Sequence, residues 1–119
     1  PMVNYCFSPK TNSFALALSK SGDGKNCLLV NYNDNGDKNY EVENEFGAES
    51  LSVFNGTIAV LDGNMIYAYN KSGDLKFSCD AGTGSQALIL NSDKTAYVLS
   101  INQIRYIDLS KPASEDSAR

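Results

Sequence analysis

One run of oxygen-bearing side chains has the spacing of a cation-binding loop. Asn31–Asp37 places Asn or Asp at alternate positions around Gly36, which resembles the start of a calcium loop. Such a loop needs a bidentate carboxylate at its twelfth position, and that position, counted from Asn31, is Val42. We therefore interpret the run as a hairpin turn rich in residues that tolerate positive φ.

A second run, Ser21–Lys25, superficially resembles a phosphate-binding loop. It lacks the G-x-x-x-x-G-K-[ST] spacing, and no helix pattern follows to place backbone N–H groups on a phosphate. We interpret it as a turn.

Catalytic machinery is hard to build from this chain. It contains no His, so Ser/His/Asp and Cys/His arrangements are excluded, and a zinc site is not expected. Four glutamates crowd one stretch (Glu41, Glu43, Glu45 and Glu49), but their spacing suits a solvated strand face better than a pair of catalytic carboxylates. We predict a protein that is not an enzyme, with no catalytic, cofactor-binding or metal-binding residues.

The seven tyrosines are the remaining candidates for a binding site: Tyr5, Tyr32, Tyr40, Tyr67, Tyr69, Tyr97 and Tyr106. They could form an aromatic platform for a sugar or a peptide. Three of them, Tyr32, Tyr69 and Tyr106, recur at intervals of 37 residues. A tyrosine repeated at one register is explained more simply by packing between repeats, with its hydroxyl reaching a polar partner. The residues that bind a partner stay unknown.

The elements that position these residues are short strands. Met65–Asn70 alternates with period 2, a polar turn containing Gly73 follows, and Leu75–Cys79 alternates again, which predicts a β-hairpin. Phe14–Leu18 is a nearly continuous apolar run, the pattern of a strand buried on both faces. Asn55-Gly56 and Asp62-Gly63 suit two-residue type I′ turns.

The same reading along the chain predicts eleven strands and no helix. They are Asn4–Ser8, Phe14–Leu18, Cys27–Tyr32, Asn39–Glu43, Ser50–Phe54, Thr57–Leu61, Met65–Asn70, Leu75–Cys79, Gln86–Leu90, Thr95–Leu99 and Gln103–Leu109.

The interval of 37 residues indicates repeated units of several strands. Periods of about 40 residues with several strands each are typical of propeller blades. We predict an all-β chain of about three antiparallel, four-stranded, propeller-type blades that form an incomplete propeller. The units cover about 1–46, 47–83 and 84–110, and a polar, disordered tail covers 111–119. The alternative is a two-sheet β-sandwich in which the repeat is accidental.

Ile66–Gly82 resembles the pyrroloquinoline-quinone-like β-propeller repeat. Tyr67-Ala68-Tyr69-Asn70, Gly73 and Phe77 occupy the positions of that repeat's first strand, turn and second strand. The chain has no Trp, so it departs from the packing signature of the quinone-binding enzymes. The sequence is also similar to membrane-anchored bacterial propeller proteins. That resemblance implies a module outside the cell membrane, anchored through a segment absent here.

Composition narrows the function classes. A net charge of −4 argues against a nucleic-acid partner, and no apolar run approaches the ~20 residues of a membrane span. Cys6, Cys27 and Cys79 lie in strand patterns and are expected to be buried thiols, with one disulfide plus a leftover thiol as the alternative.

Three blades leave two sheet ends open. We therefore expect either self-association through those ends or a place in a larger chain. The predicted function is a non-catalytic interaction or scaffold module that binds a protein or glycan partner and needs no cofactor. The alternative is a fragment of a quinone-dependent dehydrogenase propeller.

Overall fold

The computed structural model describes residues 2–8, 11, 13–19 and 26–111, which form eleven strands in three antiparallel sheets. The first sheet contains β1 (Met2–Ser8), β2 (Ser13–Leu18), β3 (Cys27–Tyr32) and β4 (Lys38–Asn44). The second contains β5 (Ser50–Phe54), β6 (Thr57–Asp62), β7 (Met65–Tyr69) and β8 (Leu75–Asp80). The third contains β9 (Ser85–Leu90), β10 (Thr95–Ser100) and β11 (Ile104–Asp108). Each sheet is a meander in chain order.

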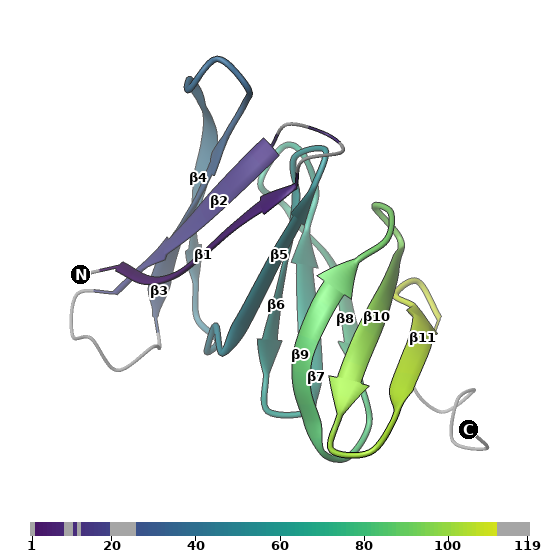
Figure 1. The fold of residues 1–119 in the computed structure, drawn as a ribbon. Coiled ribbons are helices and arrows are strands. Elements are labelled where there is room, and N and C mark those ends of the chain that lie inside the picture. Colours follow the sequence, from purple (N-terminus) through teal and green to yellow (C-terminus); the bar gives the residue numbers. More distant parts are fainter. Residues whose placement is uncertain (1, 9–10, 12, 20–25, 112–119) are drawn as a thin grey trace.

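The three sheets pack face to face in chain order, with the second sheet in the middle (Figure 1). The strand that opens each sheet lies beside the strand that opens the next, so β5 packs against both β1 and β9. One apolar cluster lies between the first and second sheets and another between the second and third. The arrangement is a stack of three sheets instead of a two-sheet sandwich.

The second sheet is buried on both faces, as its central strand shows. In β6, Ile58 and Val60 belong to the cluster shared with the first sheet, whereas Ala59 and Leu61 belong to the cluster shared with the third. All four are at most 1% exposed. The uninterrupted apolar run of β6 is therefore the pattern of a strand covered on both sides.

The strand β2 does not follow that pattern, although the sequence predicts it. Ala15 and Ala17 are buried against the second sheet, whereas Phe14, Leu16 and Leu18 are only half-buried. The prediction is wrong for the described residues because none of them covers the outer face of the first sheet.

The turns between strands are partly as predicted. Asn55 and Gly56 have φ values of 47° and 86°, the two positive angles of a type I′ turn, so this prediction is confirmed. Asp62-Gly63 is not the centre of its turn, because Asp62 still pairs with Met65. The turn residues are Gly63 and Asn64, with a positive φ of 60° at Gly63, the glycine-first arrangement of a type II′ turn.

The structure leaves two expectations untested. The division into units 1–46, 47–83 and 84–110 stays a prediction. The candidate loop Ser21–Lys25 and, apart from Lys111, the predicted tail 111–119 lie outside the described residues.

Candidate binding surface

Four strand connections lie together at one end of the stack, which we call the turn end (Figure 1). They are the β3–β4, β5–β6, β7–β8 and β9–β10 connections, and Thr11 lies beside them, bonded to Asn55. The first strand of each sheet runs toward the turn end. The first connection of the second and third sheets, and the third connection of a four-stranded sheet, therefore belong to that end. Side chains from segments far apart in the sequence therefore meet at the turn end.

The β3–β4 and β7–β8 turns have the same hydrogen-bond pattern. Asn33 Oδ1 accepts bonds from Asn35 N at 2.9 Å and Asp37 N at 3.1 Å. Asn70 Oδ1 accepts the equivalent bonds from Ser72 N at 2.9 Å and Asp74 N at 3.1 Å. The run that resembles a calcium loop is thus a hairpin turn, as interpreted, in which the Asn33 oxygen stabilises the backbone.

A polar groove of about 470 Å³ lies between the turns of the first and second sheets. Its lining residues are Thr11, Ser13, Asn33, Asp34, Asn39, Asn55, Gly56 and Lys71. Beside it, the fully buried Asn31 donates to Ser13 Oγ at 3.0 Å and accepts from Asn39 Nδ2 at 2.8 Å. These bonds hold two lining side chains in place before any ligand arrives.

Two further bonds join the groove walls across the sheets. The Tyr40 hydroxyl donates to Gly56 O at 2.6 Å, and Asn55 N donates to Thr11 Oγ1 at 3.0 Å. Burial raises the pKa of Tyr40 well above its usual value, so this hydroxyl keeps its proton at neutral pH. The groove is therefore preorganised.

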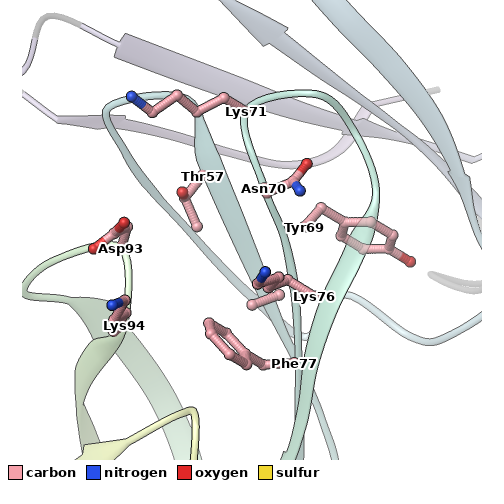
Figure 2. Close-up of a pocket in the computed structure, with 9 residues that line it drawn as sticks. Thr57, Tyr69, Asn70, Lys71, Lys76, Phe77, Asp93 and Lys94 are labelled. Atoms are coloured by element: carbon pink, nitrogen blue, oxygen red, sulfur yellow. The ribbon is translucent and has the colours of Figure 1, made fainter.

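A smaller pocket of about 250 Å³ lies between the second and third sheets, and Figure 2 shows its lining residues. The ring of Phe77 points toward Lys94, while the ring of Tyr69 points in the opposite direction, away from the pocket. The Tyr69 hydroxyl instead donates to Asn44 Oδ1 at 2.7 Å, between the first and second sheets.

Cations outnumber anions around this pocket. Lys71, Lys76 and Lys94 line it, against one carboxylate, Asp93. Among the described residues the one ion pair joins Lys38 to Glu41 at 3.4 Å, so none of the three pocket lysines is paired with a described carboxylate. The pocket combines an apolar wall with ammonium groups that are available to an anionic group.

Lys71 lines both the groove and the pocket. Its Cβ and Cγ lie 3.6 and 3.5 Å from the point where a Cβ on residue 56 would stand. The side chain therefore passes over Gly56, on the boundary between the two hollows, and makes them one surface.

The tyrosines do not gather into a platform. Tyr40, Tyr67 and Tyr69 pack between the first and second sheets, and Tyr67 stacks on Phe46. The packing interpretation holds for Tyr69, which is 4% exposed.

The same interpretation is wrong for Tyr106, which is 54% exposed on the outer face of the third sheet. The residue that takes the place of Tyr69 in the third sheet is Ile107: Ile107 pairs with Ala96 as Tyr69 pairs with Ile58. The β9–β10 connection (91–94) is longer than the β5–β6 connection (55–56), and this shifts the register.

The glutamates and cysteines form no shared site in the described residues. Glu41, Glu43, Glu45 and Glu49 are all exposed, in agreement with the solvated-face interpretation. Cys6, Cys27 and Cys79 are thiols, and burial raises the pKa of the Cys6 thiol to about 12. Within residues 2–8, 11, 13–19 and 26–111, no three His, Cys, Asp or Glu side chains come together as a metal site requires.

The lysines of the turn end were missed by the sequence reasoning. Lys71, Lys76 and Lys94 have no shared spacing, because they come together only when the β7–β8 turn and the start of β8 lie beside the β9–β10 turn. The repeated Asn-x-x-Gly-Asp turns at Asn33 and Asn70 are the one signal that could have directed attention to this end of the stack.

Comparisons with known proteins agree with this fold. No curated protein matches the sequence. Among solved structures, the chain is similar to the crystal structure of the C-terminal WD40 domain of Sif2, with a TM-score of 0.64 and 14% identity. The match covers 92% of this chain and 32% of that one, so the chain spans about a third of its length. The likeness confirms the predicted fold class: three antiparallel sheets that resemble propeller blades and do not close into a ring.

The described part of the chain contains no helix with the length and apolarity needed to cross a membrane. The family model that matches residues 3–109 is described as a family of unknown function, DUF5711. Because the match extends over most of the sequence, the chain belongs to this family.

Proposed function

We propose that this chain is a non-catalytic interaction module that binds a protein partner through its turn end. The observation that carries the proposal is the surface joined by Lys71, a preorganised polar groove continuous with a lysine-rimmed pocket that has an apolar wall. An acidic side chain beside an apolar one would fit this pocket. The complete lack of His supports a binding role over nucleophilic catalysis.

A glycan is the second candidate for the same surface. The amide and hydroxyl groups that line the groove, among them Asn39, Asn55 and Thr11, are the donors and acceptors that sugar hydroxyls need. Among the described residues, no aromatic side chain lines the groove.

The open sheet ends form the other part of the proposal. The outer faces of the first and third sheets are surfaces for association, with another copy or with further sheets of a larger chain. The location outside a membrane and the relation to quinone-dependent dehydrogenases stay predictions from resemblance, and no feature of the site favours the enzyme.

The turn end can be tested with defined probes followed by amide NMR shifts. The probes are short peptides with Glu beside an aromatic residue, matched peptides with Gln in place of Glu, and a panel of neutral oligosaccharides. We expect a Glu peptide to shift the signals of Asn33, Asn55 and Lys71. Lys71→Ala should weaken its affinity about 2–5-fold, the effect of losing one exposed charge pair.

Lys38→Ala is the matched control, because Lys38 is exposed at the same end but lines neither hollow. It should leave the affinity unchanged. Shifts from the oligosaccharides alone would favour the glycan. The proposal is wrong if no probe shifts turn-end signals at millimolar concentration, or if Lys38→Ala weakens binding as much as Lys71→Ala.

A further inference from the structure

The outer face of the third sheet repeats the face with which the second sheet contacts its neighbour. In the second sheet, the cross-strand pairs Ala59–Ala68 and Leu61–Ile66 face the third sheet and are at most 1% exposed. The equivalent pairs of the third sheet are Tyr97–Tyr106 and Leu99–Ile104, which face outward. The Leu–Ile pair is repeated unchanged, whereas the Ala–Ala pair is replaced by Tyr–Tyr.

The alanine pair allows the sheets to approach closely. The rows that face the second sheet across this contact are Leu88–Val98–Arg105 and Leu90–Ala96–Ile107, and most of their residues are buried with Ala59 and Ala68 in one cluster. The first sheet likewise presents small residues, Ala15 and Ala17, to the branched side chains of the second. Both contacts inside the stack thus set alanines of one sheet against larger apolar rows of the next. The second sheet has a cross-strand alanine pair, whereas Ala15 and Ala17 of the first sheet pair with Asn31 and Leu29.

The outer face of the first sheet has the larger apolar rows and no described neighbour. Its rows are Tyr5–Leu16–Val30 and Phe7–Phe14–Tyr32. Tyr5 and Phe7 are 68% and 59% exposed, and Phe14 stacks on Tyr32 with ring centroids 5.0 Å apart. These rows correspond to Leu51–Val60–Tyr67 and Val53–Ile58–Tyr69 in the second sheet. Those two rows are the ones that pack against the first sheet.

The surface of this outer face is shaped to receive a neighbour. Two hollows lie along it: an apolar one of about 320 Å³ beside Phe7 and Phe14, and one of about 480 Å³ beside Leu18 and Leu28 that is also lined by Glu41, Glu43 and Glu45. The apolar run of β2 is also the sequence of a strand covered on both sides. Tyr5 and Phe7 leave large apolar side chains exposed on this face, and contiguous exposed apolar side chains mark a docking surface.

We infer that the outer face of the first sheet docks a further β-sheet whose contact face carries a cross-strand pair of small residues, as Ala59–Ala68 does. The outer face of the third sheet in another copy does not supply that pair, because Tyr97 and Tyr106 place two phenol rings where the contact needs two methyl groups. The inference rests on the proposed role of the outer sheet faces in association. Of the two partners proposed there, it favours a further β-sheet over the third sheet of an identical copy.

The test gives the outer face of the third sheet the cross-strand alanine pair that the docked sheet is inferred to carry. Tyr97→Ala with Tyr106→Ala restores the pattern of the second sheet on an exposed face, so the double variant should bind head to tail to the first sheet of another copy. Sedimentation equilibrium from about 1 μM to about 1 mM covers the range of weak and moderate affinities. The unsubstituted chain should keep its monomer mass of 12.9 kDa, and the double variant should rise to at least twice that mass.

Two further variants make the result specific. Leu16→Asp, added to the double variant, places a charge on the docking face and should return the mass to that of the monomer. Ile104→Ala, which changes the same outer face without creating a small pair, should leave the chain monomeric. Far-UV circular dichroism checks that each variant keeps its sheets.

The inference is overturned if the double variant stays monomeric, if Leu16→Asp fails to reverse its association, or if the unsubstituted chain already associates through a contact that Leu16→Asp removes. None of these substitutions touches the turn end. A negative result here therefore leaves the Lys71 proposal standing, and a negative peptide result leaves this one standing.

Discussion

Two serines attach the second sheet to the third, and their substitution tests the stacking of the sheets directly. Ser50 Oγ accepts a hydrogen bond from Leu88 N at 3.0 Å, and Ser52 Oγ accepts one from Leu90 N at 2.9 Å. The Ser52 bond is buried, whereas the Ser50 bond is partly open to solvent. Ser52→Ala and Ser50→Ala therefore remove the same chemical group in two environments.

The two substitutions are expected to lower the free energy of unfolding by different amounts. Without Ser52 Oγ, the buried Leu90 N–H has no acceptor, and an unsatisfied buried donor costs about 1–3 kcal/mol. At Ser50, water can replace the lost oxygen, so the cost is only the net value of the bond, about 0.5–1 kcal/mol. We expect Ser52→Ala to lower the free energy of unfolding by about 2 kcal/mol, a large share of the about 5–15 kcal/mol of a typical domain.

The measurement is urea unfolding followed by far-UV circular dichroism, with all variants fitted by linear extrapolation. Hydrogen exchange at the Leu90 amide gives a second reading, which should become faster in Ser52→Ala. If Ser50→Ala costs as much as Ser52→Ala, or if both cost less than about 0.5 kcal/mol, the serines do not attach the sheets in the way described.

Two other predictions follow from the packing between the first and second sheets. Burial, with smaller effects from Glu45 and Tyr67, raises the pKa of Tyr69 to about 12, above the about 10 of an unfolded chain. Between these values the unfolded chain has lost a proton that the folded chain retains, so stability should fall as pH rises through this window. Tyr69→Phe should show a smaller loss of urea midpoint between about pH 8 and about pH 11, and equal losses would contradict the assignment. Gly73→Ala should cost more than Gly36→Ala in the same urea assay. Both glycines have positive φ, but a Cβ on Gly73 would stand 3.1 Å from the ring of Tyr40, whereas one on Gly36 would meet nothing within 4 Å.

The parts of the fold that depend on neighbours in the chain could be predicted from the sequence. Asn55-Gly56 predicts its turn because few residue pairs accept two positive φ angles. Asn33 and Asn70 indicate equivalent turns because each side chain bonds to backbone groups two and four residues ahead. Strand alternation is equally local. These features need no knowledge of which sheets become neighbours.

The candidate site depends on distances that no local pattern contains. Lys71 becomes the boundary between a groove and a pocket because the first and third sheets pack on opposite faces of the second. The misassignment of Tyr106 has a related cause. A fixed interval of 37 residues cannot follow a turn that changes length, and a shift of one residue moves a side chain to the opposite face of its strand.

The two ends of the stack show how far residue type alone can indicate burial. Phe14, Leu16 and Leu18 lie on a face that no described residue covers. Contact of these apolar side chains with water is unfavourable compared with burial. The third sheet places Tyr97 and Tyr106 at its open face, and a phenol ring tolerates partial exposure because its hydroxyl can stay hydrated. Apolar content is high at both ends, but the first end has large apolar rows like those of the second sheet, whereas the third end has Tyr–Tyr in place of the Ala–Ala pair. The difference between the ends is therefore a property of the paired residues across each sheet, and it becomes visible only once the strand register is known.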